Sequence, residues 1–148
     1  MKDIFNFLYL NEKLSSSGMP TPGQVKEIAE AGKKVVINLA TAKSEGAIPN
    51  EEELVTALGM NYIHIPVDWN NPTAENLSEF IAAMESHNDD DVFVHCQANY
   101  RATAFISLYR IQRLGWEKAE AYAFMNKIWN PEEFPVWEKF MEENTKGY

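Results

Sequence analysis

The sequence predicts an α/β fold, with a central, mostly parallel β-sheet flanked by helices and a helical C-terminal part. Up to about residue 95, short apolar runs of strand length alternate with segments of helical periodicity. The run 35–39, Val-Val-Ile-Asn-Leu, is almost continuously apolar, which is typical of a strand buried on both faces of a parallel sheet. From residue 101 onward the apolar residues keep only the helical spacing.

The individual elements follow from this periodicity and from turn residues, and segment 15–23 is expected to be a turn-rich loop. The expected strands span residues 4–10, 35–39, 60–67 and 92–94. The expected helices span residues 22–31, 51–58, 74–86, 101–114 and 116–128, with a last one from residue 131. Three residues have the side chains of helix N-caps, namely Thr21, Asn50 and Thr73. Three glycines mark helix ends, namely Gly32, Gly59 and Gly115.

Length and charge restrict the functional classes. The 148 residues are expected to form a single domain, spanning residues 1–148. There are 13 Lys and Arg residues against 22 Asp and Glu, a formal charge of −9, and no basic cluster. This balance argues against nucleic acid and against anionic membrane surfaces as partners. The apolar run 4–10 is too short to span a bilayer, so a cytoplasmic location is expected.

The chain has one cysteine, Cys96, directly after the expected strand 92–94. A lone cysteine forms neither an internal disulfide nor a multi-cysteine zinc site, so it is either a small buried apolar residue or a reactive thiol. The loop after it leads into a helix, which directs backbone N–H groups and a helix N-terminus at one point. Such a point attracts an anion and stabilises a thiolate. Arg101 adds a planar guanidinium that can hold phosphate or sulfate through two hydrogen bonds, and Asn99 tolerates the left-handed conformation that a tight loop needs.

The segment 92–98, Val-Phe-Val-His-Cys-Gln-Ala, followed by Arg101, resembles the signature of cysteine-dependent phosphatases of the protein-tyrosine and dual-specificity type. Segments 8–10, 17–21 and 63–68 occur in matching order, so the resemblance covers most of the chain. It is most similar to bacterial phosphatase-like domains of the branch also found fused to metallo-β-lactamase-type hydrolases. The resemblance implies the phosphotyrosine phosphatase II type of fold.

The resemblance also implies the roles of individual residues. Cys96 would be the nucleophile that forms a phosphocysteine, Arg101 would bind the phosphoryl oxygens, and Asp68, which lies 28 residues before Cys96, would be the general acid and then the base. The substrate would be a phosphomonoester, such as phosphotyrosine, phosphoserine or a small phosphate ester, and no metal or organic cofactor is expected. His95 would support the thiolate through hydrogen bonds. The phosphate-binding loop would include His95, Gln97, Ala98, Asn99, Tyr100, Ala102 and Thr103.

The sequence departs from the family signature in ways that leave alternatives open. Only four residues separate Cys96 from Arg101, one fewer than in the signature, and this is the spacing of rhodanese-type sulfurtransferases. Ala102 stands where the family often has Ser or Thr, with Thr103 as a substitute, and a small shift of alignment would put Asn71 at the acid position. A persulfide-carrying sulfurtransferase and a phosphate-binding pseudophosphatase are therefore the two alternatives to a phosphatase.

Overall fold

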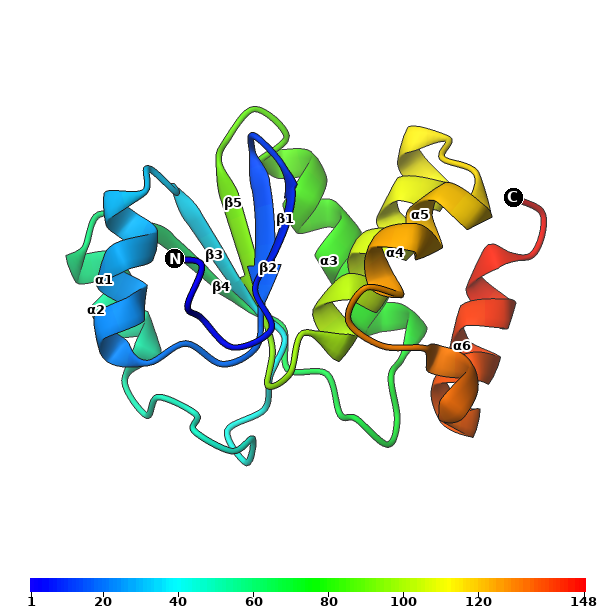
Figure 1. Ribbon diagram of the computed structural model, residues 1–148, viewed down its shortest axis with the longest axis horizontal. Coiled ribbons are helices and arrows are strands. Elements are labelled where there is room, and N and C mark those ends of the chain that lie inside the picture. Colours follow the sequence, from blue (N-terminus) through cyan, green and yellow to red (C-terminus); the bar gives the residue numbers. More distant parts are fainter.

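The computed structural model describes residues 1–148 and is built around one five-stranded sheet with the strand order β1-β2-β5-β3-β4 (Figure 1). The strands are β1 (Leu8–Asn11), β2 (Leu14–Ser17), β3 (Val35–Asn38), β4 (Asn61–His64) and β5 (Val92–His95). Strand β1 is antiparallel to β2, and the other three neighbouring pairs are parallel. The expectation of a mostly parallel sheet is therefore confirmed.

Helices cover both faces of the sheet, as the alternation of strands and helices predicts (Figure 1). On one face, α1 (Pro22–Glu30) and α2 (Glu51–Ala57) pack on Val36 and Phe93. On the other face, a larger core joins Val35, Ile37 and Val94 to four helices. These helices are α3 (Ala74–Ser86), α4 (Tyr100–Leu114), α5 (Lys118–Met125) and α6 (Pro135–Thr145), and a 3₁₀ turn, η1 (Pro131–Glu133), precedes the last.

Two of the three expected helix caps form as predicted. Thr21 and Thr73 each accept a hydrogen bond from the backbone of the third helical residue, whose side chain bonds back to the cap, and this reciprocal pair satisfies two free N–H groups. Asn50 occupies the N-cap position of α2, but its side chain makes no cap hydrogen bond.

The N-terminal part differs from the sequence-based expectation. The strand expected at 4–10 is β1 and begins only at Leu8, and part of the loop expected at 15–23 is instead the buried strand β2. Strand β2 lies inside the sheet, between β1 and β5, and its serines, Ser15, Ser16 and Ser17, are buried. Backbone hydrogen bonds to the neighbouring strands stabilise β2. Its polar side chains show no apolar pattern, so the sequence does not predict this strand.

The four parallel strands end at the same edge of the sheet, at Ser17, His95, Asn38 and His64. In parallel α/β sheets, ligands bind beyond this carboxyl edge. The loops that begin there carry Gly18, Cys96 and Asp68. No helix in the structure combines the length and the apolar character that a membrane crossing needs.

Candidate active site

Cys96 lies at the exit of β5, in the turn that joins the strand to α4. Cys96 is fully buried from bulk water. It nevertheless lines a cavity of about 290 Å³, and the other lining residues are Trp69, Gln97, Ala98, Tyr100 and Arg101. Tyr100 and Arg101, the first two residues of α4, line this cavity, so the N-terminus of α4 lies beside it. The arrangement is one that favours an anion and a thiolate.

Arg101 lies in the first turn of α4 and is only 6% exposed. Its Nη1 donates a hydrogen bond of 2.7 Å to the carbonyl of Val67, and Nη2 reaches the hydroxyl of Ser44 at 3.5 Å. The guanidinium thus joins the loops that follow β3 and β4 and is held on the wall of the Cys96 cavity. Cys96 and Arg101, which the sequence predicts to act together, are brought together.

Two asparagines fix the shape of the turn. Asn99 has the left-handed conformation expected for it, with φ of 68°, and Asn6 has φ of 51°. The amide of Asn99 donates to the carbonyl of Asn6 at 2.8 Å, and the amide of Asn6 donates to the carbonyl of Ala98 at 3.0 Å. These two hydrogen bonds tie the loop 96–101 to the N-terminal segment.

Gly18, directly after β2, supports the same loop, and its replacement by alanine is expected to destabilise the protein and to displace the loop. A Cβ atom at Gly18 would lie 2.6 Å from the carbonyl oxygen of Gln97 and 2.7 Å from the ring of Phe5. Overpacking of this kind costs about 1–3 kcal/mol, and here one of the crowded atoms is backbone of the loop itself. Urea unfolding of Gly18→Ala, followed by a phosphatase assay, measures both effects.

Gly23 provides the matched control for this prediction. It lies in α1, has an ordinary φ and has only the Thr21 hydroxyl within 4.0 Å of an added Cβ. Gly23→Ala should leave the protein as stable as the wild type or slightly more so, because alanine is the better helix former. If Gly18→Ala unfolds at the same urea concentration as Gly23→Ala, the close packing described for Gly18 is wrong.

Asp68 follows β4 and occupies the turn next to the cavity without lining it. Its carboxylate is exposed and accepts a hydrogen bond of 2.9 Å from the backbone N–H of Asn70. The Arg101 side chain donates to the carbonyl of Val67, the residue before Asp68, so it joins the loop of Asp68 to the loop 96–101. Asn71 donates its N–H to the carbonyl of Asp68 in the same turn. The role of Asp68 as the acid stays a prediction.

An aromatic cluster forms one wall of the site. Trp69, next to Asp68, packs on Tyr100 of the loop 96–101 with ring centroids 5.9 Å apart, and Tyr100 stacks on Trp129 at 4.7 Å with the rings almost parallel. Trp137 donates its indole N–H to the carbonyl of Trp69 at 2.9 Å. The C-terminal helical part therefore holds the Asp68 loop in place, and Trp69 and Tyr100 remain partly exposed at the cavity.

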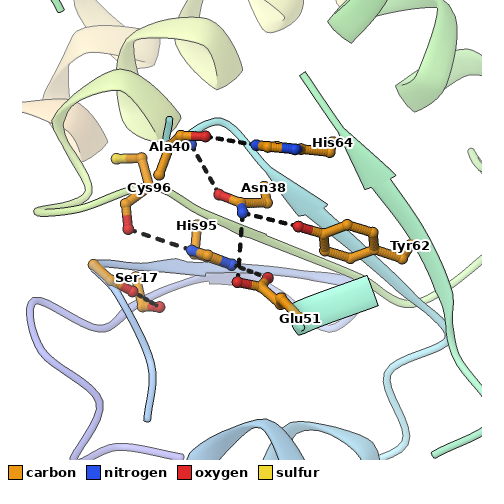
Figure 2. A network of polar contacts seen from close by, with 9 residues as sticks. Ser17, Asn38, Ala40, Glu51, Tyr62, His64, His95 and Cys96 are labelled. Carbon is orange, nitrogen blue, oxygen red and sulfur yellow. Dashed lines mark hydrogen bonds and ion pairs between the residues drawn. The ribbon is translucent and has the colours of Figure 1, made fainter. Parts of the chain in front are cut away.

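His95 points to the other face of the sheet, away from the Cys96 side chain (Figure 2). Its Nε2 lies 2.6 Å from the carboxylate of Glu51 at the start of α2, and its Nδ1 lies 3.3 Å from the carbonyl of Cys96. Asn38 donates to Glu51 at 3.4 Å and to the hydroxyl of Tyr62 at 3.0 Å. Burial above all, together with Glu51 and Glu52, raises the pKa of Tyr62 to about 12, so this hydroxyl stays protonated at neutral pH.

The last two predicted loop residues, Ala102 and Thr103, are buried and do not line the cavity. Ala102 is fully buried in the core. Thr103 donates its hydroxyl hydrogen to the carbonyl of Asn99 at 2.7 Å and accepts from the indole of Trp129 at 2.9 Å. In this arrangement the Thr103 hydroxyl braces the loop and the aromatic cluster. The structure contains no group of three or more His, Cys, Asp or Glu side chains arranged to hold a metal ion.

The sequence does not predict two features of the site, namely the contact of Glu51 with His95 and the tight packing at Gly18. Glu51 stands in a run of three glutamates that is fully explained as acidic residues at a helix N-terminus, so nothing in the pattern distinguishes it. Gly18 belongs to segment 17–21, one of those that carry the resemblance, but the contact itself depends on the pairing of β2 with β5.

Known proteins are similar to this chain over most of its length. A family model described as a DSP-PTPase phosphatase fused to NAD⁺ kinase matches residues 11–140. A beta-lactamase hydrolase-like protein of Xylella fastidiosa is 27% identical over 108 residues, which is 69% of this chain and 24% of the relative. The chain therefore spans about a quarter of the length of the curated relatives it matches.

Two solved structures are also similar to this chain. The crystal structure of a DUF442 phosphatase from Shewanella putrefaciens CN-32 is 39% identical, has a TM-score of 0.88 and covers 99% of this chain and 93% of its own. TpbA of P. aeruginosa, solved as a cysteine-to-serine variant in complex with pTyr, shares the fold, with a TM-score of 0.73, 14% identity and coverage of 95% and 88%. The chain therefore belongs to the DSP-PTPase family of cysteine-type phosphatases, in the form known from fusions to NAD⁺ kinase.

Proposed function

We propose that the protein hydrolyses phosphomonoesters through a phosphocysteine intermediate on Cys96. The observation that carries the proposal is the shared cavity of Cys96 and Arg101 at a strand-to-helix turn, where backbone N–H groups gather. Oriented amides and a guanidinium supply the charge that a phosphoryl group requires during transfer. The net charge of −9 does not oppose this, because a local field within a few residues outweighs distant, screened charges.

In the first half-reaction, the Cys96 thiolate attacks phosphorus in line with the ester oxygen. The S–P bond forms while the P–O bond to the leaving group breaks, and the leaving oxygen takes a proton from the Asp68 carboxyl group. Arg101 and the loop amides hold the three other phosphoryl oxygens and neutralise their charge. Contact of Arg101 with Val67 keeps the loop of Asp68 beside the phosphoryl group.

In the second half-reaction, water attacks the phosphocysteine. Asp68, now a carboxylate, takes the proton of the water as the new P–O bond forms, and the S–P bond breaks to return the Cys96 thiolate and release inorganic phosphate. No further reactant is needed, since the water supplies the oxygen and the proton that the acid gave away.

The aromatic wall favours an ester with a flat leaving group. Trp69 and Tyr100 line the cavity beside Cys96 and are braced from behind by Trp129 and Trp137, so they offer a rigid apolar surface next to the phosphoryl site. Aromatic rings gain about 0.5–1.5 kcal/mol from such contacts beyond the area they bury. An aryl phosphate such as phosphotyrosine is therefore the substrate class we propose, ahead of phosphoserine and small alkyl phosphates.

The test compares the wild type with Cys96→Ser on p-nitrophenyl phosphate. We expect kcat to fall by at least about a thousandfold, because loss of a covalent nucleophile removes the whole pathway that depends on it. Phosphate should still raise the thermal unfolding temperature of Cys96→Ser, since the loop amides and Arg101 remain. Phosphate release that continues in Cys96→Ser would contradict the proposal.

A second assay addresses the sulfurtransferase alternative that the Cys96–Arg101 spacing favours. Wild type and Cys96→Ser are incubated with thiosulfate and cyanide, and thiocyanate is measured. Cysteine-dependent thiocyanate without cysteine-dependent phosphate release would replace the phosphatase proposal by sulfur transfer. If the wild type releases no phosphate and forms no thiocyanate, while phosphate still raises its thermal unfolding temperature, the protein is a phosphate-binding module and not a phosphatase.

A further inference from the structure

We propose that Glu51 is a positioning residue that acts through His95: it keeps a proton on the imidazole beside Cys96 and so favours the Cys96 thiolate. The inference rests on the proposed function, in which that thiolate is the nucleophile. It extends the site to the opposite face of the sheet and to a helix, α2, that contributes nothing to the cavity of Cys96.

The contacts form a short chain from α2 to the nucleophile (Figure 2). The Glu51 carboxylate is 2.6 Å from Nε2 of His95, and Nδ1 of His95 is 3.3 Å from the carbonyl of Cys96. His95 is fully buried and Glu51 is 4% exposed, so solvent screens their interaction only weakly. Asn38 donates to the other carboxylate oxygen and fixes the orientation of Glu51.

The hydrogen-bond partners determine how many protons the pair holds. The Cys96 carbonyl only accepts, so Nδ1 of His95 must carry a hydrogen. The contact between Nε2 and Glu51 needs one more hydrogen, either on the ring or on the carboxyl group. The pair is therefore an imidazolium with a carboxylate or a neutral imidazole with a carboxylic acid. In the first form the positive end lies next to Cys96 and the negative end lies farther away, which stabilises a thiolate.

No other group on this face supplies that positive charge. Glu52 of α2 is an acid, and the pKa of Tyr62 on β4 is raised to about 12, chiefly by burial, so its hydroxyl remains neutral. His64 on β4 directs Nε2 at the carbonyl of Ala40, at 2.7 Å, and not at the pair. From β5, the only titratable neighbour of His95 along the chain is Cys96 itself.

The pair also has its own route to solvent. Glu51, Tyr62 and His64 line a second cavity, of about 650 Å³, on the α2 side. The residues of this cavity do not include Cys96 or Arg101. The shared proton of Glu51 and His95 can therefore exchange with water without passing through the site of phosphoryl transfer.

The test is the pH dependence of Cys96 alkylation by iodoacetamide in folded protein, with Glu51→Gln against the wild type. A glutamine amide can donate to Nε2 of His95 while its oxygen accepts from Asn38, so the hydrogen bonds survive and only the charge is lost. We expect the midpoint of the alkylation rate to rise by about one pH unit, which is a roughly tenfold slower reaction well below the midpoint. The rate at high pH should equal that of the wild type.

Glu52→Gln is the matched control, because Glu52 is the exposed neighbour in the same helical turn and its loss removes the same charge from the N-terminus of α2. It should reproduce the wild-type profile. A Glu51→Gln profile identical to that of Glu52→Gln would overturn the proposal, and so would a lowered rate at high pH, which reports a damaged site.

His95→Asn tests the same link from the other end and covers the case in which Glu51→Gln does not fold. Asparagine can donate to the Cys96 carbonyl but cannot take up a proton. We expect the same upward shift, with no added shift when Glu51→Gln is combined with it; a wild-type midpoint in His95→Asn overturns the proposal. Alkylation needs no phosphatase turnover, so failure of the proposed function and failure of this inference are distinguishable.

Discussion

Replacement of Arg101 by lysine is expected to lower kcat/KM for p-nitrophenyl phosphate by about a hundredfold to a thousandfold, the range for loss of a preorganised transition-state donor. The guanidinium contacts the Val67 carbonyl and still has N–H groups for the cavity of Cys96. A lysine ammonium is a point charge without the planar fork, so it cannot bond the Val67 carbonyl and two phosphoryl oxygens in the same geometry.

Arg113→Lys is the control for this variant. Arg113 lies in the last turn of α4, is exposed and is remote in the helix from the first-turn Arg101. Its replacement should leave kcat/KM unchanged. An Arg101→Lys protein that is folded and retains wild-type kcat/KM would show that Arg101 serves only to join the loops after β3 and β4.

Replacement of Asp68 by asparagine should produce an effect that depends on the leaving group. An alkyl phosphate requires a proton on its departing oxygen, so its kcat/KM should fall by about a hundredfold to ten-thousandfold, the usual contribution of a general acid. For p-nitrophenyl phosphate, whose leaving group departs easily as an anion, the loss in the first half-reaction should be much smaller. Values of kcat/KM, which report the first half-reaction alone, measure this dependence on a series of phosphates with leaving groups of increasing basicity.

Two controls accompany Asp68→Asn. Asp89 is exposed in the turn before β5, at the opposite edge of the sheet, and Asp89→Asn should behave as the wild type on every substrate. Asn71→Ala tests the alternative alignment, and it should not reproduce the dependence on the leaving group. Equal losses of kcat/KM for Asp68→Asn across the whole series would remove Asp68 from proton transfer to the leaving group.

Much of the fold was predictable because apolar periodicity and helix caps are local signals. The buried run at 35–39 and the caps Thr21 and Thr73 needed only a few neighbouring residues to recognise. Strand β2 was not predictable in this way. Its three buried serines carry no apolar pattern, and its place in the sheet depends on pairing with β5, more than seventy residues away.

In the candidate site, too, the residues within one segment were predictable and the contacts between distant segments were not. Cys96, Asn99 and Arg101 lie within one short segment directly after an apolar strand, so the sequence of that segment was enough to predict that they form one site. The pair of Glu51 and His95 spans 44 residues, and the support of the loop by Gly18 depends on the register between β2 and β5. Such contacts follow from the assembled sheet, and a pattern within a single segment does not contain them.

The most direct test of the phosphocysteine mechanism is to trap the intermediate. Asp68→Asn should still let Cys96 attack an activated aryl phosphate, but it should slow the attack of water because the base is missing. Rapid acid quench during turnover, followed by mass spectrometry, should reveal the mass of one phosphoryl group on the peptide that contains Cys96. That added mass should be absent from Cys96→Ser. Turnover without any phosphorylated Cys96 peptide, or the same added mass in Cys96→Ser, would contradict the account.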